Sequence, residues 1–251
     1  MMTMKMGFRN FWKTQSIAHL FFIPKIVIVV MDIAVFFLII QIVGTNNLLD
    51  ILVYGSLAAV LECIVWLVTS TANQYIADVV NTELNLEKYR QYINYEYHHS
   101  FWLNRTKRNH VIACQQAVIL YLEGNFHESL EMLQSIKVSY LPSKLKTVRY
   151  YYLSLCQAHL GQEISSLAHL SPSQVEWVEI VTQILKGEVV EDNFESYSQN
   201  KLLGLAVTFY RALNERNQGN AEREKEHLET TASETANLFY VREARKYLEE
   251  L

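Results

Sequence analysis

Two acidic side chains lie inside otherwise apolar stretches of this sequence, where a charged group is least expected. Asp32 precedes Val43 by 11 residues, and Glu62 follows Leu49 by 13 residues. If both stretches are membrane helices joined by the turn between them, the two carboxyl groups lie roughly 17 to 20 Å below one membrane surface. Acids at such a depth usually face a partner group or a water-filled cavity.

The acidic pair Asp32 and Glu62 has two interpretations. Two adjacent carboxylates cannot both ionise cheaply, so a shared proton, a bound cation, or a Lys or Arg from another protein would stabilise them. Alternatively, both acids lie near enough to the cytoplasmic interface to be protonated or to draw in water. On the second helix, Gly55 and Ala59 share a face with Glu62, and such small residues allow close helix contact.

No other group of residues indicates catalysis. The sequence contains no GxxxxGK[ST] or GxGxxG loop, no HExxH motif, no GxSxG turn and no paired-cysteine motif. The adjacent His98 and His99 would point to different faces of a helix, which makes them a poor chelating pair. We therefore expect no enzyme activity, no cofactor and no metal site.

The three cysteines, Cys63, Cys114 and Cys156, all lie in apolar helical patterns. An odd count in a protein expected to face the cytoplasm argues against a disulfide framework. We expect reduced, buried thiols.

The segment that must position the two acids is residues 24–70. Its apolar runs, 26–43 and 48–68, are each about 18 to 21 residues long, which matches the hydrocarbon thickness of a bilayer. The polar break at residues 44–47 has room only for a tight turn, so we expect a transmembrane hairpin. The lipid bilayer is then one partner of the chain.

The charges beside this hairpin predict its orientation. Four cations and no acid precede the first span, and the turn contains no Lys or Arg. Both termini should therefore be cytoplasmic, with the cell membrane as the expected location. The four cations are Lys5, Arg9, Lys13 and Lys25.

Residues 1–23 form a basic segment with aromatic residues at helical spacing. We expect an interfacial helix whose aromatic side lies at the headgroups and which ends at a break made by Pro24. A disordered basic tail is the alternative. The aromatic residues are Phe8, Phe11, Trp12 and Phe22.

The rest of the chain is polar enough to be soluble. Residues 71–109 are expected to form a helical juxtamembrane connector, rich in tyrosine towards its end. Residues 111–251 hold 13 Lys and Arg against 19 Asp and Glu, a difference of −6. Nucleic acid is repelled by that charge and is not an expected partner.

Residues 110–251 show helix-length apolar patterns separated by Gly-polar pairs. The pairs begin at Gly124, Gly161, Gly187 and Gly219, with spacings of 37, 26 and 32 residues. Periods near 34 residues are typical of stacked helical hairpins. We therefore expect an all-helical domain.

Small residues flank the first of these glycines, with Ala117 in the helix before Gly124 and Ser129 in the helix after it. Together with further matching positions, they make residues 113–142 resemble a tetratricopeptide repeat. The further positions are Leu120, Leu133, Ile136 and Pro142.

The later units match this family less well. The unit aligned on Gly161 has a short second helix over residues 163–170, and the unit aligned on Gly187 has an adequate first helix over 173–186 but a weak second one. The last unit, residues 200–251, has Ala212 at the small position.

The resemblance implies a curved stack whose first helices line a peptide-binding inner face. It places Cys114 and three aromatic residues in one column, with Tyr121 one turn along in the first unit. These aromatic residues suit an apolar or extended peptide, and the alternative is that they are ordinary core residues. The candidate partner-binding residues are Tyr121, Tyr151, Trp177 and Phe209.

The predicted fold class is all-α, with a two-helix transmembrane hairpin followed by a cytoplasmic domain similar to tetratricopeptide repeats. The predicted function is that of a membrane-anchored adaptor or scaffold that binds a protein or peptide. The alternative is a small accessory subunit of a membrane complex or transporter that uses Asp32 and Glu62.

Overall fold

A computed structural model describes residues 10–45, 47–99, 105–191 and 194–251, so Lys5, Phe8 and Arg9 lie outside the described residues. Within these ranges every regular element is a helix and no strand occurs, which confirms the all-helical fold class. The chain divides into two compact units, Met1–Val79 and Val80–Leu251.

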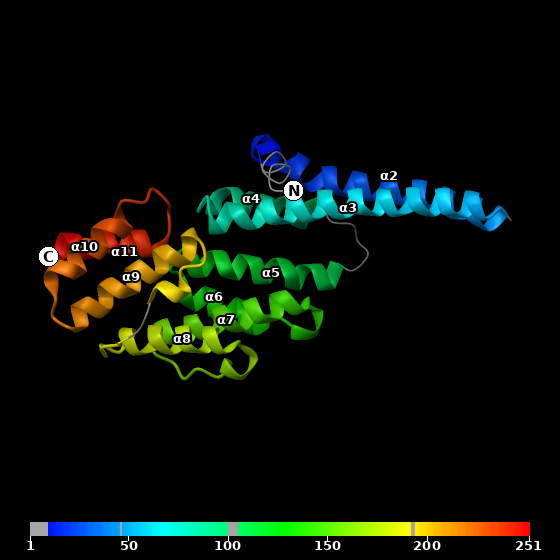
Figure 1. The fold of residues 1–251 in the computed structure, drawn as a ribbon. Helices are drawn as coiled ribbons and strands as arrows, with labels where there is room; N and C mark the ends of the chain where they lie inside the picture. Colours follow the sequence, from blue (N-terminus) through cyan, green and yellow to red (C-terminus); the bar gives the residue numbers. More distant parts are fainter. Residues whose placement is uncertain (1–9, 46, 100–104, 192–193) are drawn as a thin grey trace. The chain divides into compact units, whose positions relative to one another are not determined.

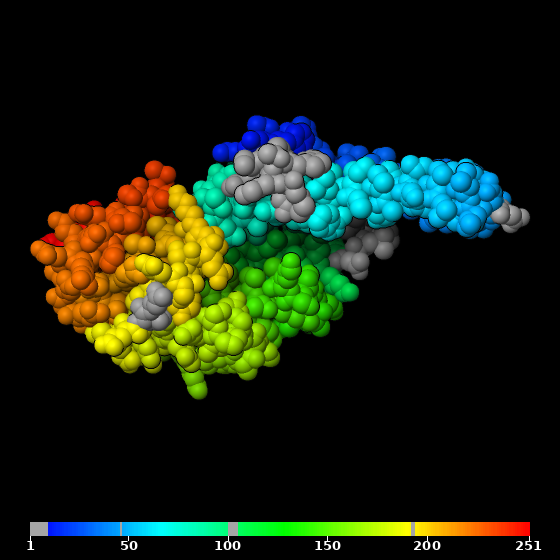
Figure 2. All heavy atoms as spheres, in the orientation of Figure 1, coloured from blue at the N-terminus to red at the C-terminus, as the bar shows by residue number. Residues whose placement is uncertain are grey.

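The first unit contains two long helices, α2 (Ile17–Gly44) and most of α3 (Leu48–Asn81), which run antiparallel (Figure 1). Both are long and apolar enough to cross a membrane. The most apolar window of each helix is not buried inside the protein, and Val43 is 81% exposed. Figure 2 shows the α3 side chains (cyan) on the surface along the helix. A core helix of a soluble protein would bury these side chains.

Polar side chains between the two helices satisfy the start of α3. The Leu49 N–H donates to Asn47 Oδ1 at 3.1 Å, and the Thr45 hydroxyl donates to Asp50 Oδ2 at 3.2 Å. Asn47 thus accepts a hydrogen bond from one of the N–H groups that have no partner within the helix at its start. The negative charge of Asp50 stabilises the helix, because it lies near the positive end of the helix dipole. The described part of the predicted turn therefore acts as a helix cap.

The prediction that Pro24 breaks the chain before the first span is wrong. The first long helix begins at Ile17, where the Ser16 side chain accepts a backbone N–H of the first turn, and Pro24 lies inside it. A proline removes one backbone donor, but long membrane-type helices tolerate this loss. Leu20 and Phe21, in the turn before the proline, are buried and hold that turn in place.

A short helix over residues 10–14 precedes α2, and its Trp12 does not face lipid as the interfacial prediction requires. The ring is 1% exposed, and its Nε1–H donates to Thr71 Oγ1 of α3 at 3.2 Å. Phe11 and Phe22 remain exposed. This contact ties the segment before the first apolar helix to the far end of the second.

The second unit is a series of helices joined by turns and by two longer segments, one before α8 and one before α9 (Figure 1). Neighbours along the chain pack against each other from α4 to α5 and through to α11. The α-helices are α4 (Leu86–His99), α5 (Arg105–Leu122), α6 (Phe126–Ser135), α7 (Ser143–His159), α8 (Pro172–Leu185), α9 (Lys201–Asn217), α10 (Ala221–Ala232) and α11 (Phe239–Glu250). The 3₁₀ turns are η1 (Val138–Tyr140), η2 (Leu167–His169) and η3 (Phe194–Tyr197).

All four predicted turn glycines end a helix in the left-handed conformation. Their φ angles are +79° at Gly124, +65° at Gly161, +83° at Gly187 and +76° at Gly219. After each one, the following N–H bonds back five residues, as Asn125 does to the Leu120 carbonyl at 2.9 Å. This is the Schellman geometry, which a glycine adopts without steric cost.

Two of the four predicted hairpins have two α-helices. Between α5 and α6, Ala117 and Ser129 are both fully buried, and the Ser129 hydroxyl donates to the Ala117 carbonyl at 2.7 Å. The α9–α10 pair is the other. The helix predicted over 163–170 is instead the 3₁₀ turn η2, and η3 stands after α8, so the repeat is incomplete in both places.

The segment predicted as a separate connector, residues 71–109, is divided between the two units. Val80, Leu84 and Leu86 belong to the hydrophobic core of the second unit. On α4, Ile93 packs with residues of α5. The helical domain therefore begins near residue 80 and includes α4.

Candidate peptide-binding pocket

Two of the four predicted inner-face residues, Tyr121 of α5 and Phe209 of α9, lie in the core. They are 1% and 3% exposed. The last helix, α11, covers them: the Phe239 ring lies 5.7 Å from that of Tyr121, and the Tyr240 ring lies 5.6 Å from that of Phe209. The C-terminal helix therefore occupies the space beside this part of the predicted inner face.

His159 joins the same aromatic core. Its ring stacks on Phe126 at 3.9 Å, and its Nε2 shares a hydrogen bond of 2.6 Å with the Tyr210 hydroxyl. Burial lowers the pKa of His159 to about 3 and raises the pKa of Tyr121 well above its ordinary value. Both groups are therefore neutral at physiological pH, and they act as packed hydrogen-bonding groups, not as proton carriers.

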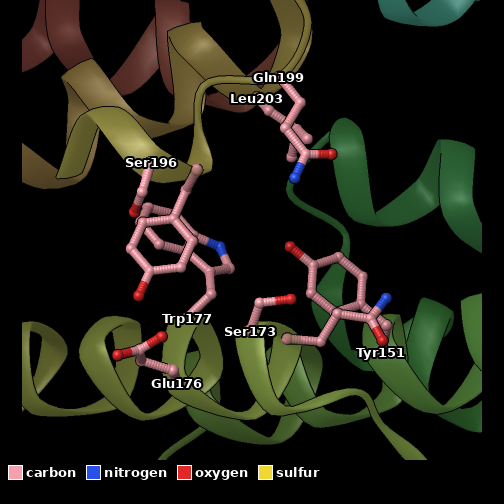
Figure 3. Close-up of a pocket in the computed structure, with 9 residues that line it drawn as sticks. Tyr151, Ser173, Glu176, Trp177, Ser196, Gln199 and Leu203 are labelled. Carbon is pink, nitrogen blue, oxygen red and sulfur yellow. The ribbon is translucent and has the colours of Figure 1, made fainter. Parts of the chain in front are cut away.

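The other two predicted residues, Tyr151 of α7 and Trp177 of α8, line one open pocket, although Trp177 is itself only 4% exposed and belongs to the same hydrophobic core. The volume of the pocket is about 320 Å³, and nine residues line it. Figure 3 shows Tyr151 on one side, with Trp177 and Glu176 on the other. The remaining lining residues are Ser173, Gln174, Ser196, Tyr197, Gln199 and Leu203.

Four of the nine lining residues come from α8, and helical periodicity explains why three of them face the pocket together. Ser173, Glu176 and Trp177 are spaced i, i+3 and i+4, so they share one face. Ser171 and Gln174 form a capping box before that face, and the Ser171 N–H donates to Gln174 Oε1 at 3.1 Å. The start of α8, and with it the α8 wall of the pocket, is thereby fixed.

The second wall comes from η3 and the start of α9. The Tyr197 ring lies 5.1 Å from that of Trp177, and Leu203 stands in the first turn of α9. Asn200 caps that turn by accepting the Leu203 N–H at 3.0 Å. The sequence patterns missed Ser196, Tyr197, Gln199 and Leu203, because a 3₁₀ turn and a loop have no periodicity that marks a face.

Polar groups face the open centre of the pocket. In Figure 3 the Tyr151 hydroxyl, the Ser173 hydroxyl and the Trp177 indole N–H point into it, with the Gln199 amide above. The Trp177 N–H donates a hydrogen bond to the Tyr151 hydroxyl, and the Ser173 hydroxyl and the Gln199 amide can donate and accept hydrogen bonds beside this aromatic surface. Such an arrangement suits the binding of a polar chain with one larger side chain.

Metal-ligating groups do not gather around this pocket. In the part of the chain that the structure describes, no three His, Cys, Asp or Glu side chains stand close enough to hold an ion. Cys114 and Cys156 are buried, and burial raises the pKa of each thiol to about 11. Both thiols are therefore protonated at physiological pH.

The two acids predicted to lie within the membrane belong to the first unit. Asp32 of α2 and Glu62 of α3 are both exposed on the helix surfaces. Gly55 and Ala59 are exposed as well, and a Cβ added to Gly55 would meet nothing within 4 Å. The small-residue face of α3 is therefore open, and it is not used for contact with α2.

Comparison with known proteins adds no relative. No protein-family model matches the chain, and no curated protein or solved structure matches it either. The resemblance to tetratricopeptide repeats therefore stays a prediction from sequence.

Proposed function

We propose that this protein is a membrane-anchored adaptor whose helical unit binds a peptide segment of a partner protein in the pocket between Tyr151 and Trp177. One observation carries the proposal: two of the four predicted binding residues line an open pocket of about 320 Å³. The proposed role is binding without catalysis, since polar groups and aromatic surface together are typical of a recognition pocket.

The anchor is the pair α2 and α3, with both termini cytoplasmic and the cell membrane as the location. The exposed apolar windows of the two helices support this arrangement, because lipid would cover them. Alkaline washing should leave the protein in the membrane pellet. Protease added outside intact cells should leave the C-terminal part intact, and its digestion would contradict the orientation.

Filling the pocket tests the binding role. A photo-reactive amino acid placed at the exposed rim residue Gln199 should form a discrete adduct with one partner protein in intact cells. Ser173→Trp puts a large ring into the pocket from an exposed position on α8 and should abolish the adduct. Gln183→Trp adds the same ring to an exposed position of α8 that does not line the pocket, and the adduct should persist. An adduct that survives Ser173→Trp would refute the pocket as the binding site.

A second candidate function rests on Asp32 and Glu62. Both acids are exposed on apolar helices, and Glu62 shares its open face with Gly55 and Ala59. A partner transmembrane helix carrying Lys or Arg would cover that face and pair with the acids, as expected for an accessory subunit of a membrane complex or transporter. Asp32→Asn with Glu62→Gln should then release a co-purifying membrane protein, while Ser173→Trp should not.

A further inference from the structure

The lining of the pocket differs from an apolar groove in one respect. Among the nine residues that line it, only Glu176 is charged, and it is exposed. The described residues include no Lys, Arg or His within ion-pair distance of its carboxylate, although seven other such pairs occur among them. The pocket therefore presents a carboxylate that no cation of the described chain neutralises.

The elements around Glu176 carry further negative charge. The α8 helix contains Glu176 and Glu179 and no Lys or Arg, and η3 contains Glu195 and no cation. The cation nearest to the second wall, Lys201 at the start of α9, is paired with Glu234 at 2.8 Å. The carboxylate of Glu176 at the rim therefore lowers the free energy of a cation there, and the effect weakens with salt. A positively charged group is thus the complementary occupant.

Aromatic rings stand next to this carboxylate. Tyr197 packs on Trp177 with ring centroids 5.1 Å apart, and Tyr151 stands on the other side. Ring faces attract cations, and guanidinium groups more often than ammonium groups. The volume lies at the lower end of the roughly 300 to 1,000 Å³ typical of ligand pockets, so it suits one long side chain.

The same chain already holds a guanidinium in this way. Arg216 of α9 places its Cζ 4.0 Å from the centre of the Tyr247 ring, and its Nε donates to Glu224 Oε1 at 2.6 Å. A ring and a carboxylate together therefore fix a cationic side chain in this fold. The pocket likewise has a ring and a carboxylate side by side.

We propose that the pocket takes the cationic side chain of the partner peptide, with arginine preferred over lysine. Tyr151 and Tyr197 provide ring faces, Glu176 pairs with the charge, and the Ser173 hydroxyl donates to a carbonyl group of the peptide. This inference rests on the proposed function and adds to it the residue type that the partner presents.

Fluorescent peptide pools test the inference. The full-length protein in detergent micelles is titrated with short peptides of mixed sequence whose central residue is arginine, lysine, citrulline, leucine or glutamate. Citrulline keeps the shape of arginine without its charge. The arginine pool should bind about tenfold more tightly than the citrulline pool, since a ring contact and an exposed ion pair each contribute modestly. Lysine should fall between them.

Two matched variants assign the preference to the carboxylate. Glu176→Gln should remove most of the difference between arginine and citrulline, while Glu179→Gln, one turn further along α8 and outside the pocket, should keep it. Equal binding of arginine and citrulline, with Ser173→Trp still abolishing both, would overturn the cation preference and leave the peptide pocket standing. Failure of every pool to bind, or binding that ignores Ser173→Trp, would overturn the pocket function itself.

Discussion

Alanine at two of the turn glycines tests whether α11 lies on the α5–α6 turn. Both Gly124 and Gly161 have positive φ, so both substitutions carry a similar backbone cost. A Cβ on Gly124 would lie 3.0 Å from Phe239 Cβ, whereas a Cβ on Gly161 would meet nothing within 4 Å. The difference between the two variants therefore isolates the contact with α11.

The magnitudes follow from these geometries. Left-handed backbone costs a residue with a Cβ roughly 1–2 kcal/mol, and the stiffer unfolded chain returns roughly 0.4–1 kcal/mol, so Gly161→Ala should lose about 1 kcal/mol. Overpacking at Gly124 adds about 1–3 kcal/mol, because both Cβ atoms are fixed by backbone. For a unit of this size, 1 kcal/mol lowers the melting temperature by about 2–4 °C.

The assay is a thermal melt of the full-length protein in detergent micelles, followed by the near-ultraviolet circular dichroism of the tyrosine-rich core. Gly124→Ala should lower the melting temperature two to four times as much as Gly161→Ala. Gly187→Ala, which also has open space around its Cβ, serves as a second reference and should match Gly161→Ala. Equal shifts for Gly124→Ala and Gly161→Ala would refute the packing of α11 against this turn.

Three further outcomes are expected. Because the pKa of His159 is lowered to about 3 while the unfolded residue titrates near 6.5, its contribution to stability is complete above about pH 6.5 and is lost as the pH falls towards 3. The free energy of unfolding of the wild type should therefore fall by up to about 2 kcal/mol between pH 7 and 5. His159→Gln should reduce this fall, while His127→Gln, a change at an exposed site, should not. If the free energy of unfolding of His159→Gln depended on pH as steeply as that of the wild type, the burial of the ring would be contradicted. At neutral pH in intact membranes, a membrane-impermeant maleimide should label none of the three cysteines, because Cys114 and Cys156 are buried with raised pKa values. Cys63 is exposed on α3 and not buried in the protein as the sequence predicted, but lipid covers it in the proposed anchor, so labelling of Cys63 would place α3 in water. Trp12→Ala should destabilise the first unit by about 3 kcal/mol or more, because it removes a buried ring and its hydrogen bond to Thr71. Proteolysis of the segment before α2 should then be faster, and an unchanged rate would mean that the contact with Thr71 does not hold the segment.

Local features of this protein could be predicted from sequence. Two apolar runs long enough to span a bilayer gave the positions of α2 and α3, because helix length and composition are properties of a single segment. The turns at Gly124 and Gly219 were predictable for the same reason, since a left-handed helix end depends on one residue and its neighbours. The prediction of a break at Pro24 was wrong because the packing of the preceding turn overrides the local tendency of proline to end a helix.

Only the tertiary structure decided which aromatic residues form a site. Tyr121, Tyr151, Trp177 and Phe209 share one sequence pattern, yet α11 covers the first and last of them, while Tyr151 and the edge of the buried Trp177 line an open pocket. The residues that cover Tyr121 lie 119 positions away along the chain, as the Tyr121–Tyr240 hydroxyl contact at 3.4 Å shows. Periodicity identifies the apolar face of a helix, and the element that packs on that face is selected by contacts between distant segments, which no local pattern contains.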